Sequence, residues 1–255
     1  MTGLKARLAS GERLLGALLR LPAEDLVEMV AIAGFDFVVV DCEHGPSEVA
    51  ELRRHLVLAE THRVPVLVRV GSDEPALTLR ALDQGAAGVI APHIDTAEQA
   101  RALVEAAHYP PLGHRGFATY TRTGRFGTVD PAEHQARLTA ETLVLGMIES
   151  PVGVEHAAEV IGVPGLDGIM IGTADLRASS SPADPDPAES VRRVNRELAA
   201  QTRLRMDIVG TPAAATAAFD DGAHLVVYNL AHALMVHLAE LRSARPTTSG
   251  GGTPG

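Results

Sequence analysis

The sequence predicts a (β/α)₈ barrel in a single domain, and three observations lead to this fold class. Eight short apolar runs are spread along the 255 residues, each with the length of a strand buried on both faces. Stretches with helical spacing of apolar residues lie between them. No glycine-rich phosphate fingerprint follows the first strand, which disfavours the alternative, an open doubly wound sheet with the same local pattern.

The expected strands follow the apolar runs in order. They are rich in Val, Ile and Leu, as strands of a helix-covered parallel sheet are, and turn residues bound most of them. The runs are LLGALL (14–19), FDFVVVD (35–41), PVLVRV (65–70), AGVIAP (87–92), LVLGMIE (143–149), DGIMIG (167–172), MDIVG (206–210) and HLVVYN (224–229).

Helices are expected between these strands, several of them beginning at Ser, Thr or Pro and ending at Gly. Examples cover 23–34, 47–60, 74–85, 96–108, 151–162, 190–201 and 211–222. The apolar segment LAHALMVHLAEL (230–241) predicts a further helix that is able to pack on a neighbouring subunit.

Three segments interrupt the alternation. Residues 109–131 are rich in Gly, Arg and Thr and are too long for a minimal connection, so we interpret them as a functional excursion, with a plain surface loop as the alternative. SSSPADPDP (179–187) predicts a mobile loop or lid after the sixth strand. The expected organisation is a barrel domain over 1–242 and a disordered tail over 243–255.

Composition excludes several classes of function. Lys and Arg total 22 against 32 for Asp and Glu, a formal net charge of −10 that repels phosphate backbones, so no nucleic acid partner is expected. No apolar stretch reaches the ~18 residues of a membrane span, and the first residues lack the apolar run of a signal peptide. We therefore expect a cytoplasmic protein with no membrane partner.

Two residue types occur once each. Lys5 is the only lysine and lies where the chain is expected to fray, so Schiff-base chemistry is not expected. Cys42 is the only cysteine, which rules out an internal disulfide and a multi-cysteine zinc site. We interpret Cys42 as a small buried hydrophobe rather than a nucleophile.

Polar residues gather where the expected strands end, and the C-terminal ends of barrel strands are where active sites lie. Glu149 and Asp175 come from consecutive strands and suit a hard divalent cation, with separate rim salt bridges as the alternative. Arg69 beside them would stabilise a developing oxyanion or a carboxylate, or form a rim ion pair. His44 is predicted to be a general acid/base with Asp41 orienting its ring; a capping or surface role is the alternative.

Other polar residues are weaker candidates. Asp83 would hydrogen-bond into the site from behind, or would be a polar residue near the end of its helix. The remaining histidines carry no metal-ligand spacing and are not expected in the site; they include His55, His62, His108, His134 and His156.

Six stretches of the chain stand out together: GFDFVVVDCEHGP, PVLVRV, LDQGAAGVIAPHIDTAEQA, YPPLGHRG, GMIES and GVPGLDGIMIGTADL. In this order and combination they resemble the HpcH/HpaI aldolase family, over residues 16–241. The resemblance implies (β/α)₈ barrels that assemble into hexamers as trimers of dimers, often with the last helix exchanged between neighbours.

The resemblance also implies a reaction. The family's class II aldolases use Mg²⁺, Mn²⁺ or Co²⁺, with no nucleotide and no Schiff-base lysine. They cleave or form a 4-hydroxy-2-oxo acid from an aldehyde and pyruvate, or a related 2-oxo acid, through a metal-stabilised enolate. The alternatives are an oxaloacetate-type decarboxylase or a citrate-lyase-β-like acyl-CoA lyase with the same enolate, and a barrel without catalysis.

Residue by residue, the resemblance places the metal on Glu149 and Asp175, the enolate-stabilising arginine on Arg69, and the acid/base pair on His44 and Asp41. The backbone around Gly172, Thr173 and Ala174 would bind the pyruvate carboxylate, and Arg122 would bind the distal end of the aldehyde. Three positions depart from the family pattern and surround the expected site: Met147, Thr173 and Arg177.

Overall fold

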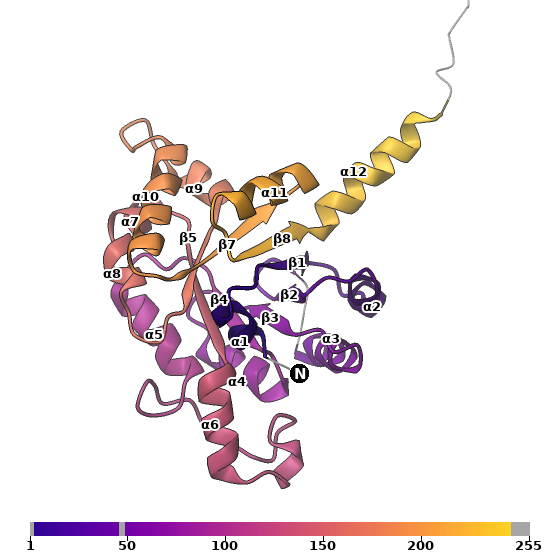
Figure 1. Cartoon of the computed structure of the whole chain (residues 1–255), viewed down its shortest axis with the longest axis vertical. Coiled ribbons are helices and arrows are strands. Elements are labelled where there is room, and N and C mark those ends of the chain that lie inside the picture. Colours follow the sequence, from indigo (N-terminus) through magenta and orange to yellow (C-terminus); the bar gives the residue numbers. More distant parts are fainter. Residues whose placement is uncertain (1–2, 46–48, 246–255) are drawn as a thin grey trace, which may run out of the picture.

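The chain folds as a closed barrel of eight parallel strands (Figure 1). The structure, a computed structural model, describes residues 3–45 and 49–245. Each expected apolar run overlaps one strand, and β8 pairs with β1, so the open-sheet alternative is wrong. The strands are β1 (Leu14–Leu19), β2 (Phe37–Asp41), β3 (Val66–Arg69), β4 (Gly88–Ala91), β5 (Leu143–Ile148), β6 (Gly168–Ile171), β7 (Leu204–Val209) and β8 (Leu225–Asn229).

Helices alternate with the strands and cover the barrel. Segment 151–162 forms two short helices, and α1, α6 and α9 were not expected. Two of these, α1 and α9, are six and seven residues long, too short for a helical period to show. The helices are α1 (Leu4–Ala9), α2 (Glu24–Ile32), α3 (Val49–Thr61), α4 (Pro75–Gln84), α5 (Ala97–Ala107), α6 (Pro131–Glu141), α7 (Pro151–Glu155), α8 (Ala157–Ile161), α9 (Thr173–Ser179), α10 (Pro187–Ala200), α11 (Pro212–Asp220) and α12 (Leu230–Ser243).

The barrel interior is filled by every second residue of the strands, as the two-residue period of a strand requires. Gly16 leaves room for the largest of these side chains, because a Cβ there would lie 2.6 Å from the ring of Phe37. A second apolar layer packs between the strands and the helices. The interior cluster comprises Leu14, Leu18, Phe37, Val39, Leu67, Ile90, Leu143, Leu145, Met147, Met170, Met206, Leu225 and Val227, closed from below by Leu4 and Leu8.

Helix α1 closes the N-terminal end of the barrel, which corrects the expectation of a frayed terminus. Leu4 and Leu8 are buried in the interior cluster. Lys5 Nζ lies 2.8 Å from Asp167 Oδ1 and donates to the carbonyl of Thr142 at 3.2 Å. Since Thr142 and Asp167 immediately precede β5 and β6, the single lysine lies at the end of the barrel opposite the strands' C-terminal ends.

The irregular segments lie at the periphery. Residues 108–130 contain only a 3₁₀ turn (η1, Arg125–Gly127), an irregular structure that fits both the functional excursion and the plain surface loop. Residues 180–186 join α9 to α10 without regular structure. Of the expected tail 243–255, Ser243 ends α12 and residues 246–255 lie outside the described residues. Within the described chain, no helix is both long enough and apolar enough to cross a membrane.

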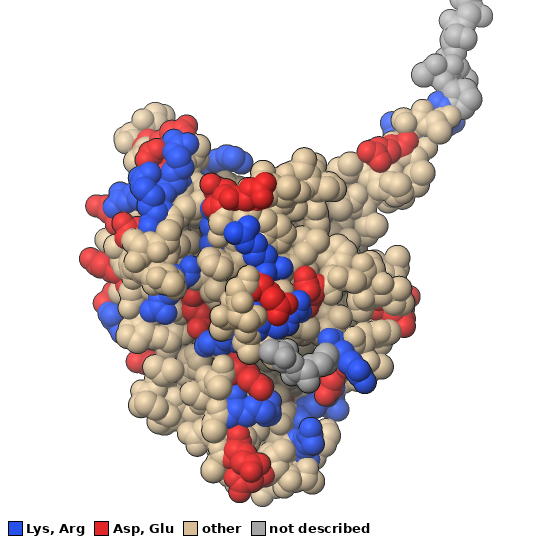
Figure 2. Space-filling view, viewed as in Figure 1, with Lys and Arg blue, Asp and Glu red and all other residues tan. Residues whose placement is uncertain are grey.

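Helix α12 projects away from the barrel (Figure 1). Its large apolar side chains Met235, Val236, Leu238 and Leu241 are exposed. In the space-filling view most of its surface is uncharged, with charged residues near its distal end (Figure 2). Exchange of this helix between subunits stays a prediction.

Candidate active site

The alternation that fills the barrel also places charged side chains at its C-terminal end. On four strands, the last apolar residue that points into the barrel is followed two positions later by a charged residue. The two-residue period of a strand places this charged side chain on the same inward face. Leu18 is followed by Arg20, Val39 by Asp41, Leu67 by Arg69 and Met147 by Glu149. A polar layer therefore lies directly on the apolar filling, where active sites of this fold lie.

Asp41 and Arg69 form a fully buried, bidentate ion pair. Arg69 Nε donates to Asp41 Oδ1 at 2.9 Å and Nη2 donates to Oδ2 at 2.5 Å. Arg20 Nε donates to Oδ2 at 2.8 Å. Burial opposes ionisation of Asp41, but the hydrogen bonds and charge of Arg69, together with Arg20, outweigh it and lower the pKa of the carboxyl.

The expectation that Asp41 orients the His44 ring is not what the structure shows. Asp41 Oδ1 accepts from the backbone N–H groups of Glu43 at 3.1 Å and His44 at 3.3 Å, which fixes the turn after β2. The His44 side chain is 56% exposed, and its Nε2 lies 3.9 Å from Glu43 Oε1. The physical reason is that Arg69 and Arg20 already occupy the carboxylate of Asp41.

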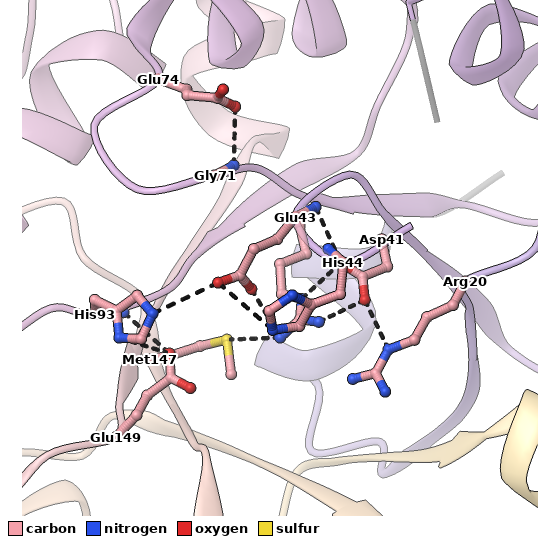
Figure 3. A network of polar contacts seen from close by, with 10 residues as sticks. Arg20, Asp41, Glu43, His44, Gly71, Glu74, His93, Met147 and Glu149 are labelled. Atoms are coloured by element: carbon pink, nitrogen blue, oxygen red, sulfur yellow. Dashed lines mark hydrogen bonds and ion pairs between the residues drawn. The ribbon is translucent and has the colours of Figure 1, made fainter. Parts of the chain in front are cut away.

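Glu43 and His93 belong to the site, although the sequence interpretation did not single them out (Figure 3). Glu43 Oε2 lies 3.0 Å from Arg69 Nη1, and its Oε1 lies 3.6 Å from His93 Nε2. His93 Nδ1 lies 3.9 Å from Glu149 Oε1. Both residues lie two positions beyond the end of a strand, β2 and β4, the same signal that identified the others.

Glu149 is a buried carboxylate held by one backbone hydrogen bond. Its Oε1 accepts from the N–H of His93 at 3.0 Å. Burial raises its pKa, His93 opposes this, and the negative charges of Asp175 and Glu43 add to the rise. A cation bound beside Glu149 would stabilise its ionised form. Gly172 leaves the space, since a Cβ there would lie 2.4 Å from Glu149 Oε2.

Asp175 lies in the exposed first turn of α9, beside the first-turn amides of Thr173 and Ala174. N–H groups at this position have no partner within a helix and suit an anion. The N–H of Gly172 is not one of them, because it donates to the carbonyl of Ile148 at 3.1 Å. The expectation that Gly172 binds substrate is therefore wrong: its missing side chain makes room for the Glu149 carboxylate.

Asp83 and Arg122 do not reach the site of their own chain. Asp83 Oδ1 accepts from Arg115 Nη2 at 2.7 Å. Arg122 Nη1 donates to the carbonyl of Gln84 at 3.0 Å, and its guanidinium also pairs with Glu60. Helices of this fold run opposite to the strands, so the C-terminal end of α4 lies at the N-terminal end of the barrel, away from Glu149.

Cys42 and Met147 adjoin the buried ion pair of Asp41 and Arg69. Burial, with the charges of Asp41 and Glu74, raises the pKa of Cys42 to about 12, so its thiol stays protonated and is a poor nucleophile. Met147 is buried, with its Sδ 3.9 Å from Arg69 Nη1. Of the departures from the family pattern, Met147 alone contacts a polar site residue among the described contacts.

The arrangement has a definite chemical capacity. Within residues 3–45 and 49–245, no three His, Cys, Asp or Glu side chains are grouped as ready metal ligands. Glu149 and Asp175 lie close enough for the charge of Asp175 to raise the pKa of Glu149, and two such carboxylates suit a hard cation that keeps several waters. The fixed guanidinium of Arg69 lies in the same polar layer, where it could bind an oxygen of a small acid.

Comparisons with known proteins relate the chain to a family of aldolases and lyases. The model of the HpcH/HpaI aldolase/citrate lyase family matches residues 16–239. The chain is 35% identical to a pyruvate aldolase of Rhizobium etli, over 82% of this chain and 80% of the relative. It is 36% identical to a 2-dehydro-3,6-dideoxy-6-sulfogluconate aldolase of Pseudomonas putida, over 68% of each.

A solved structure shows the same fold over nearly the whole chain. It is a HpcH/HpaI aldolase/citrate lyase family protein from Burkholderia cenocepacia, with a TM-score of 0.87 and 28% sequence identity. The match covers 96% of this chain and 100% of that one.

Proposed function

The chain belongs to the HpcH/HpaI aldolase/citrate lyase family, and from that premise we propose that it is a metal-dependent pyruvate aldolase. It would cleave or form a 4-hydroxy-2-oxo acid from pyruvate, or a related 2-oxo acid, and an aldehyde. The observation that carries the proposal is the buried Glu149 carboxylate, whose pKa is raised by burial and by its acidic neighbours, in one polar layer with the Arg69 guanidinium.

Glu149 and Asp175 would hold the divalent cation. Their fit rests on the donor chemistry: two carboxylates, one of them buried without a cationic side chain within hydrogen-bonding distance among the described residues, are oxygen ligands suited to Mg²⁺, Mn²⁺ or Co²⁺. When bound, such a cation supplies a Lewis acid that polarises the carbonyl of a 2-oxo acid.

The chain's own residues then divide the remaining work. Arg69 is held rigidly by Asp41 and Glu43, so it can stabilise negative charge on the substrate oxygen without reorganising. The first-turn N–H groups of Thr173 and Ala174 would donate hydrogen bonds to the pyruvate carboxylate. His44, exposed at the mouth beside Glu43, would move the proton of the aldehyde-side hydroxyl, through water.

Replacing His44 with alanine is expected to lower turnover by on the order of 10²-fold, as the loss of a general acid/base allows, while pyruvate binding is largely kept. Steady-state kinetics together with pyruvate titration would measure the two effects. His62→Ala is a matched control, because His62 lies on the outside of the barrel beside Glu28. Wild-type turnover in His44→Ala would remove His44 from the mechanism.

Decarboxylation of oxaloacetate and acyl-CoA cleavage use the same enolate chemistry and remain the competing activities. A coupled assay that follows pyruvate formation from oxaloacetate, with and without aldehyde, separates the decarboxylase from the aldolase. An aldolase is expected to form a new 4-hydroxy-2-oxo acid from pyruvate and aldehyde alone. Pyruvate release from oxaloacetate with no aldol product from any aldehyde would favour the decarboxylase. A non-catalytic barrel would show neither activity.

The exposed apolar side chains of α12 support assembly with further copies of this chain, which we propose to be a hexamer built as a trimer of dimers. Sedimentation velocity at micromolar concentration is expected to show an oligomer. Leu238→Glu should weaken it, because a carboxylate would have to be buried at the contact. A fully active monomer would contradict this prediction.

A further inference from the structure

Arg20 is a cation at the barrel mouth whose position neither the packing nor the proposed chemistry requires. It directly follows β1, two residues after the interior side chain of Leu18. Leu19 pairs with Val40 in the sheet, which brings Arg20 beside Asp41. Its side chain is 32% exposed, and Nε donates to Asp41 Oδ2 at 2.8 Å.

Asp41 does not depend on Arg20 for its partners. Arg69 contacts both of its oxygens, and Oδ1 also accepts from two backbone amides. Arg20 contributes one of the five N–H donors of a guanidinium. Across residues 3–45 and 49–245, its terminal Nη1 and Nη2 make no hydrogen bond or ion pair. In Figure 3 these two nitrogens point away from Asp41.

Arg20 lies on the side of the site opposite Glu149. In a closed ring of eight strands, β1 lies opposite β5, the strand that leads to Glu149. Figure 3 shows Asp41 between Arg20 on one side and Glu149 and His93 on the other. Helix α12, which follows β8, contacts β1 and β8 and then projects away from the barrel (Figure 1).

In the proposed function, on which this inference rests, pyruvate lies against Glu149, Asp175 and Arg69. The second substrate must then approach from the remaining side of the mouth, where Arg20 lies. We propose that the terminal nitrogens of Arg20 bind a carboxylate on the aldehyde, so that the enzyme prefers aldehydes that carry an acid group. A planar guanidinium with two parallel N–H donors matches a carboxylate better than it matches any neutral group.

The experiment compares aldehydes of equal length with and without the acid group. Pyruvate is the other substrate in every assay. Two pairs of aldehydes are compared: 4-oxobutanoate with butanal, and glyoxylate with acetaldehyde. Arg20→Gln removes the charge and the paired donors, whereas Arg20→Lys keeps a cation beside Asp41 and loses the planar geometry. Arg192→Gln is the control, because Arg192 is exposed on α10 and its removal changes the net charge equally.

The wild type is expected to prefer the acidic member of at least one pair. Arg20→Gln should lower kcat/KM for that aldehyde by on the order of 10- to 100-fold, the effect of losing a hydrogen bond to a charged group, and should change kcat/KM for the neutral aldehyde by less than about threefold. Arg20→Lys should fall between, and Arg192→Gln should match the wild type.

Two results would overturn the inference. An equal loss for acidic and neutral aldehydes in both variants would mean that Arg20 acts only through Asp41. Unchanged kinetics for both aldehydes would mean that Arg20 contacts neither. Exchange of the pyruvate methyl protons with D₂O, followed by NMR without aldehyde, isolates the pyruvate half. Absence of exchange in the wild type would contradict the proposed function instead, whereas exchange in Arg20→Gln with unaltered aldehyde preference would contradict the Arg20 assignment alone.

Discussion

Arg69→Gln is expected to lower kcat/KM for aldol cleavage by on the order of 10²- to 10³-fold, the range found when a fixed donor to a developing oxyanion is removed. Arg69 is the one arginine in the polar layer that is fully buried and held on both sides, by Asp41 and by Glu43. Glutamine at this position would be neutral and could not replace the paired donors.

The same substitution should destabilise the fold, because it leaves Asp41 buried without its main partner. Breaking a buried pair costs about 3–5 kcal/mol, and the lower end is expected here since Arg20 and two amides still contact Asp41. Urea unfolding would measure this loss. Arg115→Gln is the matched control: Arg115 is equally buried and pairs with Asp83 at the other end of the barrel.

Arg115→Gln should lose stability while the folded enzyme keeps its kcat. If Arg69→Gln lost stability alone, with kcat/KM per folded enzyme equal to the wild-type value, Arg69 would be a structural residue and its assigned role would be wrong. Arg69→Lys, which keeps the charge, should recover part of the activity but less than a planar guanidinium provides.

Glu149→Gln is expected to abolish detectable binding of Mn²⁺ and to lower turnover by about 10³-fold or more, since a bound cation supplies several kcal/mol of charge stabilisation. Glutamine keeps the shape and still accepts the hydrogen bond from the His93 amide. Isothermal titration with Mn²⁺ measures binding independently of activity. Asp175→Asn should act in the same direction.

The Glu149→Gln substitution should not destabilise the metal-free fold, although it lowers metal binding and turnover. Burial raises the pKa of Glu149, so the folded protein holds this proton more tightly than the unfolded chain and the ionised carboxylate weakens the metal-free fold at neutral pH. Glutamine removes that charge, and the metal-free variant should melt at or above the wild-type temperature. Added Mn²⁺ should raise the Tm of the wild type alone. A variant that still binds Mn²⁺ with wild-type affinity would contradict the ligand assignment.

Most of the barrel could be predicted because its physics is local. A strand buried on both faces needs a short, continuous apolar run, and all eight runs form strands. Helices with an apolar face long enough to show a period were found. Helix α6 was not, although Asp130 and Pro131 provide the cap and first-turn signals that begin it. The six-residue α1 is stabilised by the barrel interior on which Leu4 and Leu8 pack. The residues that form this interior lie far along the chain, so a local stretch of sequence does not reveal the helix.

The site divides in the same way. Asp41, Arg69 and Glu149 could be found because each lies at or just beyond the end of a strand, on the face that points inward. The same rule, applied to every strand, would have found Arg20 after β1 and His93 after β4. The contacts of Asp41 could not be predicted, because whether its carboxylate meets an imidazole or two guanidinium groups depends on how three strands come together.

The placement of Asp83 and Arg122 shows a further limit. Asp83 was expected to hydrogen-bond into the site and Arg122 to bind the distal end of the aldehyde. Instead, Asp83 lies in the C-terminal part of α4 and pairs with Arg115, and Arg122 lies against the end of that helix and pairs with Glu60. Within one chain, sequence spacing cannot show to which end of the barrel a long excursion returns. Any contact of Arg122 with substrate would require a second copy of the chain.

The most direct test of the proposed chemistry is whether the carbonyl is activated by a metal or by an amine. Lys5 is the only lysine, and it is paired with Asp167 at the far end of the barrel. Aldol cleavage would be assayed after exhaustive chelation with EDTA, after readdition of Mg²⁺, Mn²⁺ or Co²⁺, and after borohydride treatment with pyruvate, in the wild type and in Lys5→Arg. We expect EDTA to abolish cleavage, metal to restore it, and borohydride and Lys5→Arg to leave it intact. Full activity after chelation, or pyruvate trapped covalently on Lys5, would contradict the metal-dependent mechanism.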